Sequence, residues 1–268
     1  MTGTLRYGPW ALVTGASDGI GRALSQQLAA QGLNVVLVAR RRDALATLAT
    51  ELSTLHGVQT SVLAVDLGDA VGVDVVEQQT RTLDIGLVVL AAGFGTTGTV
   101  LETSSADEMD LLAVNVAAVM RLAHTFSSRL ADRGTGALVL FGSIVGWQGV
   151  PGQANYAASK AYVQSLAEGL QGELRPFGVD VLAVAPGPVG SGFGARAGLD
   201  LGSATSPDTV ARSTLAALGR RRTVVPGLQG KFLTAALWSL PRRWRSAILS
   251  RVISGMRRRS SASRPAAE

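Results

Sequence analysis

Two residues in the second half of the chain have the types and the spacing for proton transfer. Tyr156 and Lys160 stand four positions apart, so on a helix both side chains lie on one face. A phenol has a pKa near ~10, and a neighbouring ammonium favours the phenolate, which would make Tyr156 a general acid or base near neutral pH. A lone pair of this kind on a helix is more often coincidence than catalysis, so its context decides.

A glycine-rich turn near the start of the chain has the pattern of a phosphate site. The apolar run Trp10–Thr14 is a predicted strand, and a glycine-rich segment follows it just before a predicted helix. Such a turn presents free backbone N–H groups and the positive end of the helix to a pyrophosphate. The alternative is a tight turn without a ligand. The predicted cofactor contacts in this turn are Gly15, Ser17, Asp18, Gly19, Ile20 and Gly21.

Three consecutive arginines indicate which dinucleotide the turn would bind. Arg40, Arg41 and Arg42 follow the second predicted strand, where an acidic residue would select the ribose of NAD(H). A guanidinium there suits a 2′-phosphate instead, so we predict NADP(H) with contacts from Arg40 and Arg41. The alternative is a solvated cluster, although cations are disfavoured at a helix N-terminus. Asp66 and Leu67 are expected to flank the adenine, but an isolated Asp at a strand end is more often a helix cap.

Short apolar runs alternate with helical patterns along most of the chain. The predicted strands, apolar on both faces, are 10–14, 34–39, 61–65, 85–91, 137–142, 180–185 and 223–225. The predicted helices lie near 20–31, 42–55, 69–81, 105–133, 153–175 and 207–219. Repeated strand-helix units predict an α/β fold, a Rossmann-like doubly wound parallel sheet of about seven strands. We expect a single domain over residues 1–225, followed by a C-terminal extension over residues 226–268.

With the glycine turn, the Tyr156 and Lys160 pair makes the chain resemble the classical short-chain dehydrogenase/reductase family over roughly residues 9–225. The family has a serine about thirteen positions before the tyrosine, matched here by Ser143. It also has an asparagine in the helix after the fourth strand, matched by Asn115. These matches occur in the family's order and context, which makes the resemblance specific.

The resemblance implies an oxidoreductase that transfers hydride between NADP(H) and a carbonyl or an alcohol. Ser143 would polarise the substrate carbonyl, and Tyr156 would exchange the proton with it. Lys160 would bind the nicotinamide ribose and lower the pKa of the tyrosine, and Asn115 would hold a water that links Lys160 to solvent. The further cofactor contacts that the resemblance implies are Ala92, Gly93, Tyr156, Lys160, Pro186, Gly187, Val189 and Ser191.

The resemblance leaves questions open at four positions, Leu90, Ala91, Asn115 and Ser143. Leu90 and Ala91 stand where the family commonly has two asparagines, which puts in doubt the hydrogen bonding that steadies the central sheet. Ser143 could instead be a strand-end cap. Asn115 could be a mid-helix residue bonded to the backbone, although a polar side chain in an apolar stretch destabilises the fold unless it is satisfied.

Two segments after the sixth predicted strand are expected to shape the substrate end. Residues 187–206 are rich in glycine and serine and predict a mobile lid. Beyond the apolar run at 232–240, apolar residues recur at helical spacing over 244–256 with arginines on the other side, which is typical of a basic amphipathic helix. Such a helix lies on an anionic membrane surface or packs over the substrate pocket. The last ten residues are predicted to be disordered.

The net charge of +6 is concentrated at the C-terminal end. Residues 1–218 hold 13 Lys and Arg and 18 Asp and Glu, a net of −5, whereas residues 219–268 hold 12 and 1, a net of +11. A basic tail of this kind does not predict a nucleic-acid-binding face. The chain has no cysteine and only two histidines, so no metal site is expected. Without an N-terminal signal pattern or an apolar run near ~18 residues, we expect a cytoplasmic protein, with peripheral membrane contact through the extension as an open alternative.

Together these features predict an NADP(H)-dependent reductase of a hydrophobic small-molecule carbonyl, such as a ketoacyl, steroid-like or lipid-linked substrate. The alternative is a non-catalytic NADP-binding sensor or scaffold that docks to a membrane or a partner through the basic tail. The intact set of Ser143, Tyr156 and Lys160 argues against that alternative. The resemblance also implies a homodimer or homotetramer formed through the helices near 105–133 and 153–175.

Overall fold

A computed structural model describes residues 3–202 and 204–262, and its centre is a sheet of seven parallel strands. The strands are β1 (Trp10–Thr14), β2 (Asn34–Ala39), β3 (Thr60–Ala64), β4 (Ile85–Leu90), β5 (Gly136–Phe141), β6 (Val179–Val184) and β7 (Thr223–Val224). Their order is β3-β2-β1-β4-β5-β6-β7, and every pairing is parallel. The chain reverses its direction of winding between β1 and β4, which is where ligands bind in such sheets. The predicted fold class is confirmed.

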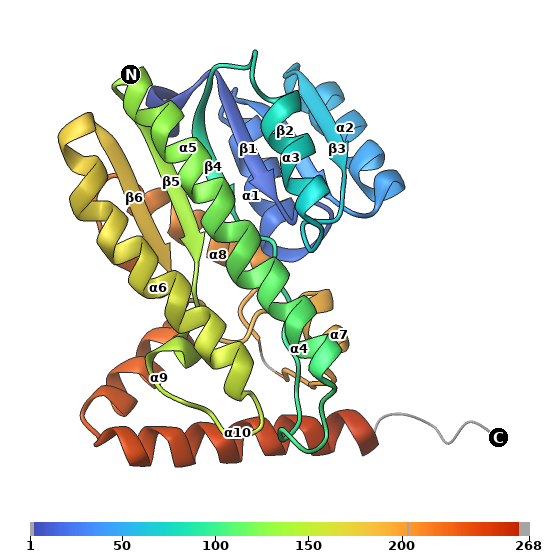
Figure 1. The fold of residues 1–268 in the computed structure, drawn as a ribbon, viewed down its shortest axis with the longest axis vertical. Helices are drawn as coiled ribbons and strands as arrows, with labels where there is room; N and C mark the ends of the chain where they lie inside the picture. Colours follow the sequence, from blue (N-terminus) through green and yellow to red (C-terminus); the bar gives the residue numbers. More distant parts are fainter. Residues whose placement is uncertain (1–2, 203, 263–268) are drawn as a thin grey trace.

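Helices cover both faces of the sheet, as Figure 1 shows. On one face are α1 (Gly19–Ala30), α2 (Arg42–His56) and α8 (Pro207–Ala217); on the other are α3 (Ala70–Gln79), α5 (Val119–Arg133) and α6 (Ala154–Leu174). Successive residues of a strand point to opposite faces, so Leu12 joins one apolar core while its neighbours Ala11 and Val13 join the other. This double burial explains why the strands are apolar throughout.

The remaining elements lie mostly around the carboxyl ends of the strands. They are η1 (Gly3–Tyr7), α4 (Ser105–Leu112), the π-helical turn η2 (Ala113–Ala118), η3 (Ile144–Trp147), η4 (Arg175–Phe177), α7 (Gly192–Ala197), α9 (Leu228–Trp238) and α10 (Arg242–Ala262). The helix predicted over 105–133 is thus three consecutive helical segments, and the predicted lid contains α7. Residues 259–262, which we predicted to be disordered, continue α10, and residues 263–268 lie outside the described residues.

The C-terminal extension packs against the rest of the molecule. Helix α10 runs across the base of the structure in Figure 1, and its buried residues Leu249 and Ile253 belong to the same apolar cluster as Tyr156. The Arg257 guanidinium donates to both carboxylate oxygens of Glu102, at 2.9 and 3.2 Å. The sequence left two alternatives for this helix, a membrane surface or packing over the substrate pocket. The structure shows the second for the inner face of the helix.

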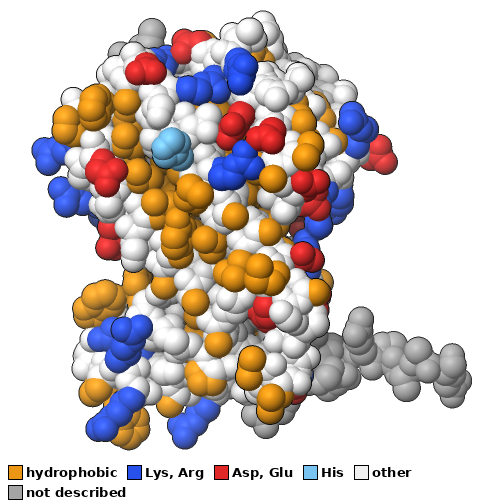
Figure 2. Space-filling view, in the orientation of Figure 1, with side chains coloured by type: hydrophobic (Ala, Val, Ile, Leu, Met, Phe, Trp, Pro, Cys, Tyr) orange, Lys and Arg blue, Asp and Glu red, His pale blue; other side chains and the backbone are white. Residues whose placement is uncertain are grey.

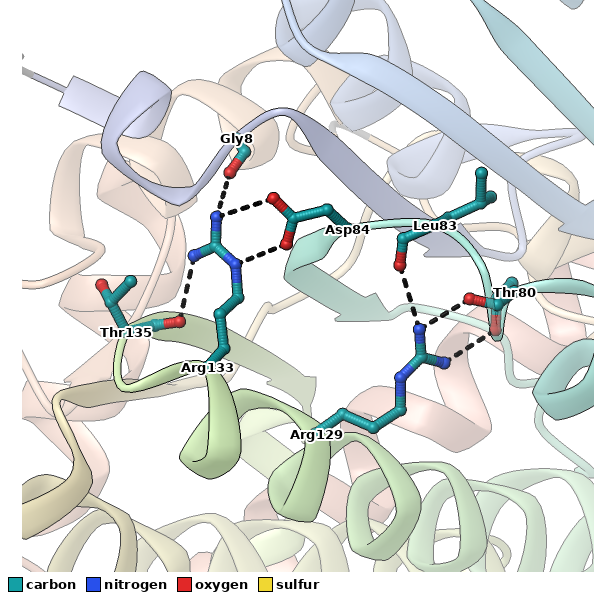
Figure 3. A network of polar contacts seen from close by, with 7 residues as sticks. All are labelled: Gly8, Thr80, Leu83, Asp84, Arg129, Arg133 and Thr135. Carbon is teal, nitrogen blue, oxygen red and sulfur yellow. Dashed lines mark hydrogen bonds and ion pairs between the residues drawn. The ribbon is translucent and has the colours of Figure 1, made fainter.

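A polar network ties α5 to the amino ends of the central strands (Figure 3). Its members are Gly8, Thr80, Leu83, Asp84, Arg129, Arg133 and Thr135. Arg133 Nε donates to Asp84 at 2.7 Å, and Arg129 donates to backbone carbonyls in the turn that leads into β4. Bonds from guanidinium groups to carboxylates and carbonyls are among the stronger ones in proteins, so they hold this end of α5 in one position.

One helical stretch among the described residues, Ser105–Arg133, is long and apolar enough to cross a membrane by length and composition alone. In the structure its α5 part packs Leu122, Phe126 and Leu130 into the apolar core beside β4 and β5. Its apolar character is therefore accounted for by packing against the sheet.

Candidate active site

A cavity of about 480 Å³ lies at the carboxyl ends of the central strands and brings distant parts of the chain together. It is lined by every predicted cofactor contact and by three of the four predicted catalytic residues. These are Gly15, Ser17, Asp18, Gly19, Ile20, Gly21, Arg40, Arg41, Asp66, Leu67, Ala92, Gly93, Ser143, Tyr156, Lys160, Pro186, Gly187, Val189 and Ser191. They meet because parallel strands all end at one edge of the sheet. Asn115 lies behind this lining.

The glycine turn forms a cradle that side chains would fill. Gly15 has φ +71°, a conformation that favours glycine. A Cβ at Gly21 would lie 2.3 Å from the Gly15 carbonyl oxygen, so α1 can approach the turn this closely only without a side chain. Asp18 caps α1 by accepting a hydrogen bond from Gly19 N at 2.7 Å. The cradle and the positive end of α1 fit the pyrophosphate of a dinucleotide.

Two arginines stand beside this cradle. Arg41 donates hydrogen bonds to the backbone oxygen and the hydroxyl of Ser17, at 3.1 and 3.3 Å. Arg40 lies 3.6 Å from a carboxylate oxygen of Asp66, and both side chains remain about half exposed. Arg42, which we had grouped with them, begins α2 and does not line the cavity. The two arginines predicted as cofactor contacts, Arg40 and Arg41, both line the cavity. Their contact with a 2′-phosphate stays a prediction.

Tyr156 and Lys160 lie on one face of α6, as the spacing predicts, and both are buried. Lys160 Nζ is 5.8 Å from the centroid of the Tyr156 ring and donates a hydrogen bond to the Phe141 carbonyl at 3.0 Å. Burial lowers the pKa of Lys160 to about 8, because the ammonium loses hydration. The lysine is thus close enough to stabilise a phenolate, and its own charge is sensitive to pH just above neutrality.

The pKa of Tyr156 moves in the direction opposite to the one we predicted. Burial raises it to about 12, and the hydrogen bond with Ser143 opposes this rise without overcoming it. The phenolate would lose its hydration in this site, and that loss dominates. Tyr156 therefore carries its proton at neutral pH, which is the form that can donate a proton to a substrate.

Ser143 combines two of the roles considered from the sequence. It caps η3 by accepting from Val145 N at 3.4 Å, and it donates to the Pro186 carbonyl at 3.3 Å. The same residue lines the cavity together with Tyr156. The cap thus fixes the position of Ser143 beside the phenol.

Asn115 positions the backbone that follows β4. Its Oδ1 accepts from Phe94 N at 3.0 Å, while its Nδ2 donates to Phe94 O at 2.8 Å and to Ser159 Oγ at 3.2 Å. A Cβ at Gly93 would lie 2.9 Å from Asn115 Oδ1 and 3.2 Å from Lys160 Nζ. The side chain of Asn115 is therefore committed to protein partners, and a water between it and Lys160 stays a prediction.

At the position where the family asparagines are replaced, Thr14 supplies a link between two strands. Its hydroxyl accepts from Ala92 N at 3.0 Å and lies 3.5 Å from the Val89 carbonyl. Leu90 is buried in the apolar core. This part of the sheet therefore has a side-chain hydrogen bond between β1 and the end of β4 despite the apolar residues Leu90 and Ala91.

The lid touches both the glycine turn and the catalytic residues. Asp18 accepts a hydrogen bond from Gly192 N at 3.1 Å, which joins the lid to the turn. The Phe193 ring lies 5.5 Å from the Tyr156 ring, between their centroids. Whether this segment moves, as predicted, stays a prediction.

The sequence predicted that the lid and the extension shape the substrate end, and the structure shows which residues close the cavity there. They are predominantly apolar and come from the segment after β4, the lid, α9 and α10: Phe94, Phe193, Leu199, Leu201, Leu233, Leu249, Val252, Ile253 and Met256. The helical spacing of apolar residues in the extension was the available signal for the last four. Only the tertiary structure shows that this face covers the cavity.

Comparison with known proteins places the chain in a class. A family model for short chain dehydrogenase matches residues 9–200. The chain accordingly belongs to the short-chain dehydrogenase/reductase family, and it is an oxidoreductase of that family.

Individual relatives are about one third identical to this chain in amino-acid sequence. The chain is 33% identical over 182 residues to a 7beta-hydroxysteroid dehydrogenase of Clostridium sardiniense, covering 68% of this chain and 70% of the relative. It is also 33% identical over 240 residues to a very-long-chain 3-oxoacyl-CoA reductase of Lodderomyces elongisporus, covering 85% and 67%. Among solved structures, a short-chain dehydrogenase from Sphingobium yanoikuyae in complex with NADPH is 30% identical, with TM-score 0.78 over 97% of this chain and 98% of that one.

Proposed function

We propose that this protein is an NADPH-dependent reductase of a bulky, hydrophobic ketone or aldehyde. One observation carries the proposal: Ser143, Tyr156 and Lys160 together line one cavity whose other end is apolar. The set provides a proton donor at the base of the cavity and a water-poor surface for the rest of the substrate. Both are what carbonyl reduction of an apolar molecule requires.

The residues divide the chemistry between them. NADPH, when bound, supplies hydride to the carbonyl carbon. When substrate binds, the Ser143 hydroxyl turns its one hydrogen from the Pro186 carbonyl to the substrate carbonyl oxygen. Tyr156 transfers its phenolic proton to that oxygen. Lys160, held by the Phe141 carbonyl, stabilises the phenolate that remains. Asn115 keeps the backbone around Phe94 in place beside this set.

The choice of NADP(H) over NAD(H) is supported by Arg40 and Arg41 at the cavity edge and by the NADPH bound in the Sphingobium yanoikuyae structure. Arg40→Asp should weaken NADPH binding by about tenfold or more and leave NADH binding little changed. Direct titration of both dinucleotides by fluorescence measures this. Arg42→Asp is the matched control, because Arg42 belongs to the same cluster without lining the cavity. Equal losses in the two variants would contradict the assignment.

The substrate class is supported by the apolar end of the cavity and by the names of the relatives, which concern a hydroxysteroid and a very-long-chain 3-oxoacyl-CoA. A panel of carbonyl compounds, followed by NADPH absorbance, should give higher kcat/KM for bulky apolar ketones than for small polar ones. The reverse order would refute this substrate class.

Replacement of the proton donor separates the reductase from the alternative of a non-catalytic NADP-binding sensor or scaffold. Tyr156→Phe should abolish turnover while NADPH still binds. Tyr162→Phe, which changes an exposed tyrosine on the same helix, should leave turnover unchanged. Retention of full turnover in Tyr156→Phe would contradict the mechanism. A homo-oligomeric state and a cytoplasmic location stay predictions.

A further inference from the structure

The outer face of α9 carries an apolar stripe that the catalytic site does not use. Leu228, Phe232 and Trp238 are 83, 78 and 59% exposed. Leu228 and Phe232, four positions apart, lie on one side of the helix, and Trp238 at its end packs one edge against Trp147. Trp244, at the start of α10, is also exposed. Large apolar side chains that gather on one surface mark an interaction site more often than single exposed ones do.

Basic side chains surround this stripe. Residues 228–262 contain eight Lys and Arg and no Asp or Glu. Lys231, Arg242, Arg243 and Arg251 are exposed. Figure 2 shows hydrophobic and basic side chains intermixed at the lower left, over α9 and the beginning of α10. The surface therefore combines apolar anchors with positive charge.

We propose that the outer surface of α9 and α10 docks onto a lipid bilayer that contains anionic headgroups. Apolar and aromatic side chains enter the interfacial region of a bilayer, where tryptophan is favoured, while arginine and lysine bind the headgroup phosphates. The inner face of α10 remains packed on the protein through Leu249 and Ile253. Docking therefore requires no unfolding of the extension.

Charge favours a bilayer over a second copy of the chain as the occupant. In a two-fold symmetric dimer the same patch would face itself, which would bring Arg242, Arg243 and Arg251 of both copies together without carboxylates from this segment. Like charges opposed across an interface destabilise it. An anionic membrane surface complements the same side chains.

Docking in this orientation would also bring the substrate end of the cavity close to lipid. Val252 both lines the cavity and is partly exposed on α10. Near the other end of the helix, the Arg257 and Glu102 ion pair is adjacent to Val100 and Leu101, two highly exposed apolar residues. An apolar substrate could then pass from the bilayer to the cavity along α10, a consequence that rests on the proposed function.

Co-sedimentation of the full-length protein with vesicles tests the docking. Vesicles of phosphatidylcholine with about a third phosphatidylserine should bind the protein at least about tenfold more strongly than pure phosphatidylcholine vesicles. Added salt should weaken the binding. Phe232→Asp should reduce binding to the anionic vesicles by about tenfold or more, and Trp238 and Trp244 should shift the fluorescence of the wild type to shorter wavelength on binding.

Matched variants separate docking from loss of fold or of catalysis. Leu55→Asp makes the same kind of change on α2, at a site 68% exposed and far from the base in Figure 1, and should bind as the wild type does. Leu228→Asp provides a second test on the stripe, where an acidic residue suits the first turn of α9. Tyr156→Phe should bind vesicles normally even if the proposed activity is wrong.

Three results would overturn the docking proposal. The first is equal binding by the wild type and by both stripe variants. The second is no preference for anionic vesicles. The third is self-association of the wild type in the absence of lipid that Phe232→Asp abolishes, because that would assign the stripe to a second copy of the chain.

Discussion

The pH dependence of the two reaction directions tests the state of the proton donor. Reduction consumes one proton, so the ratio of kcat/KM for reduction to that for oxidation must fall tenfold for each pH unit. Burial raises the pKa of Tyr156 to about 12, so near neutral pH nearly all molecules carry the phenol and very few carry the phenolate that oxidation needs. Below about pH 8 we therefore expect reduction to be independent of pH and oxidation to rise tenfold per unit.

Lys160 sets the upper limit of this behaviour. Burial lowers the pKa of Lys160 to about 8, and its ammonium stabilises the phenolate formed on proton donation. Above about pH 8 the fraction of enzyme that can carry out reduction, with Tyr156 as phenol and Lys160 as ammonium, decreases tenfold per pH unit. The kcat/KM for oxidation then becomes constant. The form that oxidation needs, phenolate with ammonium, holds as many protons as the dominant form, phenol with neutral amine, so their ratio does not change with pH. Both profiles should therefore bend at the same pH.

Initial rates from NADPH absorbance between about pH 6 and 10 measure these profiles. Lys160→Met should lower both rates and remove the bend, while Tyr162→Phe should keep it. If reduction already falls tenfold per unit below about pH 7.5 while oxidation stays constant, the resting site holds a phenolate and the reasoning is refuted.

Two further predictions concern stability. Asn115→Ala removes the side-chain partners of both backbone groups of Phe94. It should lower the free energy of unfolding by about 2–3 kcal/mol and should also lower kcat. Urea denaturation measures the first effect and turnover the second, and an unchanged free energy of unfolding would contradict the positioning role. Gly72→Ala would place a Cβ 1.9 Å from the Asp66 carbonyl oxygen and should destabilise the folded protein by about 1–3 kcal/mol. Gly172→Ala is the control: its Cβ would have no neighbouring atom within 4 Å, so it should stabilise the folded protein by up to ~1 kcal/mol. Thermal unfolding compares the two, and shifts of the same sign would show that crowding at Gly72 is not decisive.

The sheet and the cofactor cradle could be predicted from the sequence because their signals are local. The strands β1 and β2 have the predicted bounds, since residues buried on both faces form an uninterrupted apolar run. Tyr156 and Lys160 share a face because four residues make about one helical turn. These features depend on neighbours within a few residues of the chain.

Features that depend on tertiary surroundings could not be predicted in this way. The role of Arg42 depends on where α2 begins, and three consecutive arginines do not show which of them face a cavity. The pKa of Tyr156 depends on how completely the lid and the extension bury it. The spacing of Tyr156 and Lys160 indicates that the ammonium lowers this pKa, but it does not show that burial raises it. Over six residues, the periodicity of Ala113–Ala118 does not distinguish a π-helical turn from a regular helix.

That turn also limits how the chain can change by insertion and deletion. A π-helical turn holds one residue more than the α-helix around it, and each residue rotates a helix by about 100°. The extra residue sets the rotation between α4, on one side, and α5, whose Arg129 and Arg133 are fixed at the far end of the sheet. Losing one residue here would regularise the helix but turn Asn115 and α4 away from their partners. Among related chains, the length of this turn should therefore vary less than the identity of its exposed residues.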